Sequence, residues 1–173
     1  SRLLLGAVDG SVRLWDFGRK AMLWNTPPAG ASIRALAISR DGQAYAAGDL
    51  RGRIVLGRTD TGAVYRTATF AGTIPFRLAF SPDGKRIVAA MESKERGLLA
   101  WLDAATGKEI GPRRTLHNVP TNLDISPDGR TVVVAGLDRQ VPSFDMESHE
   151  PTGPDIRLPT GNAVSARFCP EGK

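Results

Sequence analysis

Short apolar runs separated by polar turns dominate this chain. The runs are five to seven residues long, and such lengths bounded by Gly, Pro, Asp and Ser are typical of β-strands rather than helices. The candidate strands are 33–39, 44–48, 76–81, 86–91, 121–126, 131–136 and 164–169. The pattern therefore predicts an all-β fold built from many short strands.

One five-residue phrase recurs along the chain at the ends of these runs. Its copies are Ile38-Ser39-Arg40-Asp41-Gly42, Phe80-Ser81-Pro82-Asp83-Gly84, Ile125-Ser126-Pro127-Asp128-Gly129 and Phe168-Cys169-Pro170-Glu171-Gly172. Successive copies begin 42, 45 and 43 positions apart. The phrase predicts a tight hairpin, because Pro fixes φ, Asp bonds its own backbone and Gly adopts positive φ. A period in the low forties is that of one four-stranded propeller blade.

The strand expected after the first corner carries a family resemblance. Residues 9–16 read Asp-Gly-Ser-Val-Arg-Leu-Trp-Asp, which resembles the signature segment of WD-repeat proteins and ends in their Trp-Asp pair. The matching places in the other repeats hold Gly57-Arg58, Trp101-Leu102 and Phe144-Asp145. The chain is therefore similar to degenerate, bacterial-style WD-repeat β-propellers over its whole length.

The resemblance implies structural roles for several of these residues. In that family an Asp six residues before the Trp anchors a hydrogen-bond network that runs through a Ser or Thr and the Trp to a His. The residues assigned to structural roles here are Asp9, Trp15, Asp16, Trp101, Asp138 and Asp145. Arg51 and Glu95 stand at the Asp position of the other two repeats, and His117 alone lies near the family's His position.

The repeat arithmetic predicts one propeller domain, or part of one, over residues 1–173. Turns are expected at 38–42, 80–84, 125–129 and 168–172, and one blade would combine 164–173 with 1–26. Isolated repeats cannot bury their apolar faces. Three arrangements stay open: a closed four-bladed ring, an eight-bladed ring formed by two copies, and a slice of a longer array.

Composition narrows the class of protein only a little. The chain has 41% hydrophobic and 24% charged residues, and no apolar run approaches the roughly 18–20 residues of a membrane span. A single cysteine, Cys169, excludes an internal disulfide and an all-cysteine metal cluster, and it is expected to be a small packed residue. A cytoplasmic location without membrane contact is the expectation.

The net charge of +5 raises the question of an anionic partner. Acidic residues interleave with the basic ones at both expected rims, and the few aromatic residues are assigned to strands. Stacking platforms for bases are therefore lacking. Nucleic-acid binding stays as the alternative function.

Catalytic chemistry finds little support in the sequence. His117 is expected to be a structural hydrogen-bonding residue in an inter-blade loop, and His149 to be solvated in an outer turn. The motifs of metalloproteases, α/β-hydrolases, P-loops and zinc knuckles are absent from the sequence, and turns and corners account for most carboxylates. We expect no enzymatic activity, no cofactor and no metal; a propeller enzyme is the second alternative.

Protein recognition is the function that the sequence favours, because propeller loops vary freely on a rigid ring. We expect contacts at the long inter-blade loop 111–120, with Arg113, Arg114 and His117, and at the neighbouring Arg96 and Arg139. The stretch 106–117 also resembles linkers of bacterial WD-repeat arrays, which are often fused to signalling domains. The expectation is an interaction scaffold within a larger signalling or regulatory protein.

Overall fold

The chain folds entirely as strands and turns in a computed structural model that describes residues 1–94 and 96–169. Within these residues there is no helix, and every strand pairing is antiparallel. The all-β prediction is confirmed. Glu95 and the last residues of the fourth turn phrase, 170–172, lie outside the described residues.

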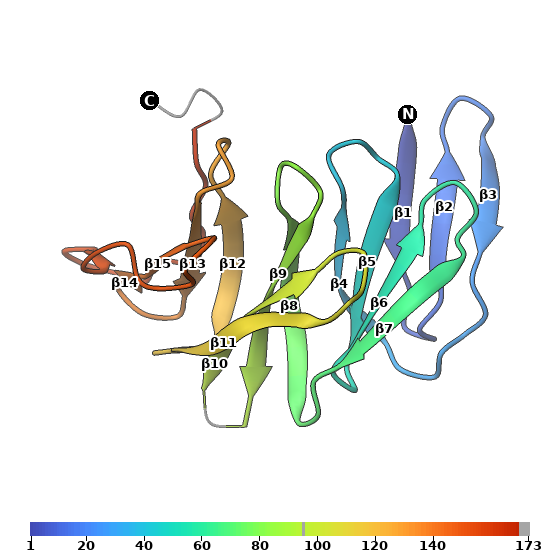
Figure 1. The fold of residues 1–173 in the computed structure, drawn as a ribbon. Coiled ribbons are helices and arrows are strands. Elements are labelled where there is room, and N and C mark those ends of the chain that lie inside the picture. The colour runs from blue at the N-terminus through green and yellow to red at the C-terminus, as the bar shows by residue number, and fades with distance from the viewer. Residues whose placement is uncertain (95, 170–173) are drawn as a thin grey trace.

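The strands form successive sheets, which we name blades 1 to 4 in chain order (Figure 1). Blade 1 contains β1 (Arg2–Gly6), β2 (Val12–Asp16) and β3 (Ala21–Asn25). Blade 2 contains β4 (Ile33–Ile38), β5 (Ala44–Asp49), β6 (Arg53–Arg58) and β7 (Val64–Thr69). Blade 3 contains β8 (Thr73–Phe80), β9 (Arg86–Ser93), β10 (Gly97–Asp103) and β11 (Glu109–Leu116). Blade 4 contains β12 (Pro120–Ile125), β13 (Thr131–Gly136), β14 (Gln140–Val141), β15 (Ser143–Asp145) and β16 (Ile156–Arg157).

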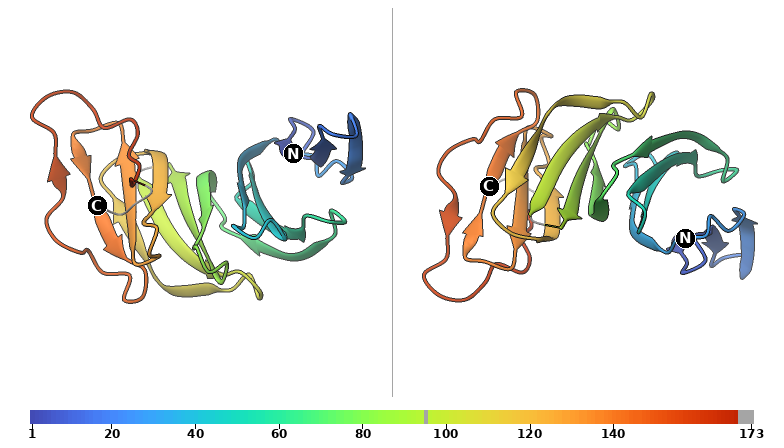
Figure 2. Two further views of the ribbon diagram at one scale, coloured as in Figure 1. Left: turned by 90° about the horizontal axis from the view of Figure 1, so that it is seen from above. Right: turned by 90° about the horizontal axis from the view of Figure 1, so that it is seen from below.

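The blades stand side by side in chain order, with β4, β8 and β12 as adjacent inner strands (Figure 2). Apolar side chains fill each space between neighbouring blades. Leu14 and Tyr45 lie between blades 1 and 2, Leu56 and Ile87 between blades 2 and 3, and Trp101 and Phe144 between blades 3 and 4. Burial of apolar area between blades, at about 25 cal/mol per Å², therefore holds the array together.

The turn phrase forms the same hairpin in blades 2, 3 and 4. In blade 3 the buried Ser81 hydroxyl donates to Asp83, and the carboxylate of Asp83 accepts the Lys85 N–H at 3.1 Å. Gly84 has φ +72°, the left-handed conformation that favours glycine. The Ser81 hydroxyl lowers the pKa of Asp83 below its usual range. These hydrogen bonds turn the chain so that β8 pairs with β9.

The fourth copy of the phrase departs from this pattern. Cys169 is exposed, whereas the serines at its position in the other copies are buried. The expectation of a packed Cys169 is therefore wrong. Residues 158–169 form no strand, so within the described part of the chain no strand pairing covers this side chain.

β1 and residues 164–169 lie at opposite ends of the row of blades (Figure 2). β1 pairs only with β2 among the described strands. Residues 164–168 lie instead beside β12, where the Phe168 N–H donates to Asp124 at 2.7 Å and the Thr121 hydroxyl to the Val164 carbonyl at 2.9 Å. A blade shared between 164–173 and 1–26 stays a prediction.

One segment expected as a loop is part of a strand. Residues 111–116 belong to β11, which leaves only 117–119 as the connection to β12. Pro112 lies on this outer edge strand, at a register shift where Gly111 has φ +67°. An edge position tolerates proline because its missing N–H faces away from the neighbouring strand. The expected contact loop 111–120 is therefore shorter than predicted.

Candidate protein-interaction rim

One rim of the blades is formed by the turns between second and third strands and by the connections that run beside them. We call this surface the corner rim. Its described corners are 7–11, 50–52, 94, 96 and 137–139, and its connections are 26–32, 70–72, 117–119 and 158–163. Backbone hydrogen bonds join the two sets: the Leu50 N–H donates to the Ser32 carbonyl and the Leu158 N–H to the Arg139 carbonyl. The corner rim is therefore a firmly supported surface.

Carboxylates shape the corners themselves. In blade 1, Asp9 accepts the N–H and hydroxyl of Ser11 at 2.9 and 2.7 Å, and it pairs with Arg13 at 3.2 Å. The Ser11 hydroxyl lowers the pKa of Asp9 below its usual range. In blade 4, Asp138 accepts the N–H of Gln140 at 3.0 Å. Both side chains act locally, within their own turns.

In blade 2 the corner is stabilised by Asp49, which does not stand at the Asp position of the repeat alignment. Arg51 stands at the Asp position, but Asp49, two residues earlier, accepts the N–H groups of Arg51 and Arg53 at 2.8 and 3.0 Å. The other oxygen of Asp49 receives the Arg53 guanidinium at 2.7 Å. The signal was available in the sequence, since Asp49 precedes the corner glycine Gly52 by three positions. Arg51 is left free to extend outward, and it is exposed.

Large apolar side chains are exposed at three of the corners. Val8, Leu50 and Leu137 each stand one residue before the aligned Asp position, and they are 84%, 47% and 53% exposed. Each is separated from its own blade core by the turn that carries it. Their common position in the repeat is visible in the sequence, but their exposure is not.

Hollows accompany the corners, and basic side chains line them. Leu50, Arg51, Ile74 and Lys94 line a hollow of about 360 Å³ where blades 2 and 3 meet. Leu137 lines a second hollow of about 350 Å³ together with Arg139 and Arg157. Each hollow also has one acidic side chain, Glu92 in the first and Asp138 in the second, so the corner rim combines apolar side chains with an excess of basic groups.

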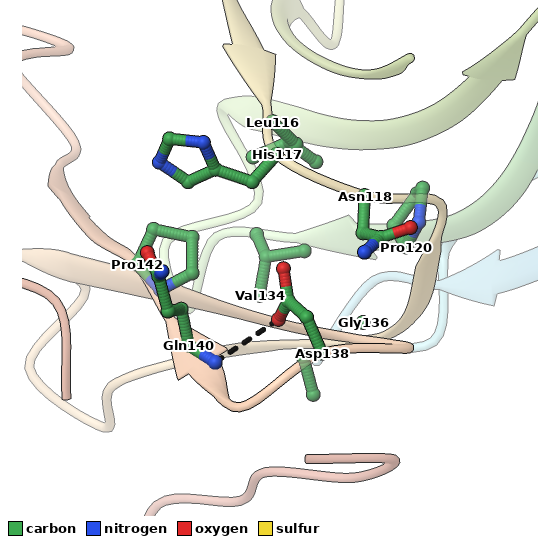
Figure 3. A pocket seen from close by; sticks show the side chains of 10 residues that line it. Leu116, His117, Asn118, Pro120, Val134, Gly136, Asp138, Gln140 and Pro142 are labelled. Atoms are coloured by element: carbon green, nitrogen blue, oxygen red, sulfur yellow. Dashed lines mark hydrogen bonds between the residues drawn. The ribbon is translucent and has the colours of Figure 1, made fainter. Parts of the chain in front are cut away.

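Three of the five expected contact residues lie on the corner rim. Arg96 and His117 share a hollow of about 350 Å³, and Arg139 lines the one beside Leu137. The side chain of His117 is 70% exposed, and its Nε2 lies 3.7 Å from a carboxylate oxygen of Asp155. His117 also lines a cavity of about 10 Å³, large enough for about one water, where Figure 3 shows it above Asp138 and Gln140. His117 was expected to act as a structural hydrogen-bonding residue, and its distance of 3.7 Å from Asp155 is longer than a hydrogen bond.

The other two expected contact residues are engaged elsewhere. Arg113 pairs with Glu109 at 2.7 Å and lies over the Phe70 ring, 4.9 Å from its centroid. Arg114 donates through Nε to the His149 carbonyl at 2.8 Å and pairs with Glu150. Both guanidiniums project from the outer strand β11 and already have partners within the chain. Their contribution to a partner surface stays a prediction.

The tryptophans and strand-end aspartates divide between packing and turn formation. Trp101 is completely buried between blades 3 and 4, whereas Trp15 is half-buried. Asp16 accepts the Arg19 N–H at 3.0 Å, and Asp145 accepts the Glu147 and Ser148 N–H groups at 3.0 and 2.7 Å. The aligned partner of these two aspartates in blade 3 is Asp103, which accepts the N–H of Thr106. When Asp103 is aligned with Asp16 and Asp145, Leu102 stands at the Trp15 position and Trp101 lies one position before it.

Neither a metal-binding cluster nor a membrane-spanning helix is found among the described residues. Across residues 1–94 and 96–169, no three His, Cys, Asp or Glu side chains cluster closely enough to hold a metal ion. In the same part of the chain, no helix has the length and apolar character needed to cross a membrane.

Comparisons with known proteins agree on one type of repeat. No protein-family model matches the sequence. SEC12-like protein 1 from Arabidopsis thaliana is 25% identical over 174 residues, which cover 98% of this chain and 44% of that protein. The WD repeat-containing protein SL1-17 from Schistosoma mansoni is 27% identical over 143 residues, covering 81% of this chain and 45% of that protein. This chain spans less than half the length of either relative.

A solved structure shares the fold. The β-propeller domain of Cps50 (Swd1) from Myceliophteria thermophila has a TM-score of 0.80 to this chain at 18% identity. The match covers 99% of this chain and 56% of the other. The fold is therefore that of a β-propeller, and the recurring turn phrase and the Trp15-Asp16 pair agree with the similarity to WD-repeat proteins.

Proposed function

We propose that this chain is a non-catalytic protein-interaction scaffold and that the corner rim is its binding surface. The observation that carries the proposal is the exposure of Val8, Leu50 and Leu137 at one position of three different repeats. Leu50 and Leu137 each line a hollow together with polar and charged side chains, and apolar side chains within a polar rim are typical of protein-contact surfaces. The similarity to WD-repeat proteins supports the same function.

The charge of the corner rim indicates the kind of partner. The corner carboxylates of Asp9 and Asp49 are paired with Arg13 and Arg53 of their own blades. The exposed basic side chains that line the hollows beside Leu50 and Leu137 are Arg51, Lys94, Arg139 and Arg157. A partner segment that combines acidic with large apolar side chains would complement this surface in both respects.

The remaining acidic chemistry fits structural roles rather than catalytic ones. Asp41, Asp83 and Asp128 each accept a serine hydroxyl and a backbone N–H within the turn phrase. These hydrogen bonds, the serine hydroxyl first, lower the pKa of each carboxyl. Carboxylates held ionised in this way are poor proton donors near neutral pH.

We propose that the chain acts through binding alone, within a larger signalling or regulatory protein.

Paired substitutions on the corner rim test the proposal. The chain carrying Leu50→Asp and Leu137→Asp would be used to purify bound proteins from native cells, in parallel with the unmodified chain. Val64→Asp is the matched control, because Val64 is 48% exposed but lies on the outer strand β7. We expect proteins retained by the unmodified and control chains to be lost from the doubly substituted chain.

Two outcomes would overturn the proposal. The first is that both corner substitutions leave the set of retained proteins unchanged while Val64→Asp alters it. The second is tight binding of duplex DNA or RNA at about 0.15 M salt, which would favour the nucleic-acid alternative. Circular dichroism of each variant separates a lost contact from a lost fold.

A further inference from the structure

A strained turn position distinguishes blade 4 from blades 2 and 3. The turn between third and fourth strands places one residue at positive φ in every blade. Blades 2 and 3 use Gly62 and Gly107, at +75° and +67°, while blades 1 and 4 use Lys20 and His149, at +50° and +63°. Residues with a Cβ rarely adopt this conformation. In blade 4 the residue in this conformation is a buried histidine in place of the glycine of blades 2 and 3.

The space between blades at this turn is filled differently in blade 4. A Cβ added to Gly62 would lie 2.6 Å from the ring of Trp24, on the outer strand of the preceding blade. Between blades 3 and 4 the two positions are exchanged. The glycine, Gly111, is on β11, the outer strand of blade 3, and the turn of blade 4 carries His149. A Cβ added to Gly111 would lie 2.2 Å from the His149 Nδ1. The His149 imidazole therefore fills from the turn the kind of space that Trp24 fills from the strand.

His149 is buried, which corrects the expectation that it is solvated. It is 5% exposed, and its ring packs on the completely buried Trp101 with centroids 4.6 Å apart and planes at 36°. The Nε2 of His149 and the Nε1 of Trp101 are both buried without a hydrogen-bond partner among the described residues. A proton added at this Nε2 would introduce a buried charge with no acceptor in reach, which is strongly unfavourable.

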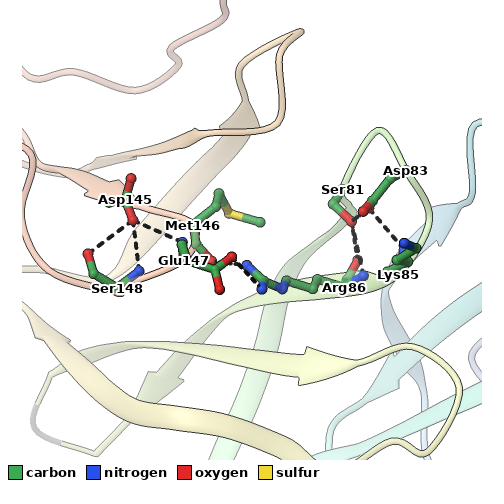
Figure 4. Close-up of polar contacts among 8 residues, drawn as sticks. All are labelled: Ser81, Asp83, Lys85, Arg86, Asp145, Met146, Glu147 and Ser148. Atoms are coloured by element: carbon green, nitrogen blue, oxygen red, sulfur yellow. Dashed lines mark hydrogen bonds and ion pairs between the residues drawn. The ribbon is translucent and has the colours of Figure 1, made fainter.

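Two arginines of blade 3 hold the turn that carries His149. Arg86 donates to the Met146 carbonyl and pairs with Glu147 at 2.7 Å, as Figure 4 shows for the ion pair. Arg114 donates to the carbonyl of His149 itself at 2.8 Å and pairs with Glu150. Turn 145–150 is therefore docked on blade 3 by two guanidiniums and one imidazole.

The charged groups around His149 shift the pKa of its imidazole in both directions. Burial, followed by the positive charges of Arg86 and Arg114, lowers the pKa of His149 below 6.5, and the carboxylates of Glu147 and Asp145 offset part of this effect. Glu150 is engaged by Arg114. Stacking on the Trp101 indole would favour a cation, but less than burial disfavours it.

We propose that His149 is a pH-sensitive latch between blades 3 and 4, closed when the imidazole is neutral and released when it is protonated. The neutral ring packs between Trp101 and Gly111 and keeps turn 145–150 docked. In the unfolded chain the imidazole is free to take up a proton at its ordinary pKa. Stability is therefore full above about pH 6.5 and falls as the pH drops from there toward the lowered pKa of the folded state.

A direct titration tests the latch without changing His149. The chain contains two histidines, so NMR of the imidazole Cε1 carbons gives two resonances, and His117→Gln assigns them. We expect the resonance of His149 to titrate below pH 6.5. A titration at or above that value would overturn the proposal. Because His117 is 70% exposed and does not contact His149, its substitution leaves the packing of His149 on Trp101 and Gly111 in place.

A stability measurement tests the consequence. Urea unfolding at about pH 7.5 and about pH 5.5 would be compared for the unmodified chain, His149→Gln and His117→Gln. Glutamine does not titrate, so we expect His149→Gln to lose less stability on acidification than the other two proteins. An equal loss in all three would refute the latch. Should His149→Gln fail to fold, the titration above decides.

Discussion

Gly57 owes its place to a side chain on the neighbouring strand. It stands where blade 1 has Trp15, and a Cβ at this position would lie 2.3 Å from the ring of Tyr45. Tyr45 is completely buried, donates its hydroxyl to the Gly62 carbonyl at 3.0 Å and stacks on Trp24. Burial raises the pKa of Tyr45 to about 12. The apolar volume missing at Gly57 is thus supplied by Tyr45 and Trp24.

This packing predicts that Gly57→Ala is destabilising. The added methyl group would force Tyr45 out of a well-packed site, and overpacking of this kind costs about 1–3 kcal/mol. Urea unfolding followed by tryptophan fluorescence measures the loss. Gly153→Ala is the control, because a Cβ there has no neighbour within 4 Å, and we expect a change of less than about 0.5 kcal/mol. Equal stability of the two variants would contradict this description of the interface.

Single residues were predictable from sequence where their role is local and not where it depends on another blade. The hydrogen bonds of Asp41, Asp83 and Asp128 follow from the turn phrase itself, because each partner lies within two residues. The burial of His149 depends instead on Gly111 and Trp101, which lie 38 and 48 positions earlier. A repeat alignment treats such a position as a solvated turn.

At the scale of elements, β11 shows how an outer strand can look like a loop. Pro112 and the surrounding polar residues predicted a loop over 111–120, but residues 111–116 extend the strand. The second strands β5, β9 and β13 were easier to predict, because they are buried and read as continuous apolar runs. An edge strand faces solvent on one side, so its composition resembles that of a loop.

The two neighbouring arginines of β11 differ in what they support. Arg114→Ala removes the donor to the His149 carbonyl and an ion pair, and hydrogen bonds of this charged kind are worth about 1.5–3 kcal/mol. Arg113→Ala removes a partly exposed pair with Glu109 and a contact with the Phe70 ring, each worth about 1 kcal/mol or less at an exposed site. Thermal or urea unfolding should therefore rank Arg114→Ala as the less stable variant. The opposite order would show that turn 145–150 is not held through Arg114.

At the scale of the whole molecule, the repeat period predicted the order of the blades and their antiparallel pairing. What the sequence could not supply was the filling of each space between blades, which differs from one pair of blades to the next. The corner rim illustrates the same division. Its corners follow from the period, while the outward direction of Leu50 and Leu137 became clear only from their exposure. The order of the repeats can thus be predicted from short stretches of sequence, whereas the packing between neighbouring blades cannot.

Hydrogen–deuterium exchange of the chain with and without a captured partner tests the corner rim most directly. If the corner rim binds the partner, backbone amides in 7–11, 50–53 and 137–140 should exchange more slowly in the complex. Amides of the opposite rim, in the turns 40–43, 82–85 and 127–130, should exchange at unchanged rates. Protection confined to those turns, with the corners unaffected, would contradict the account.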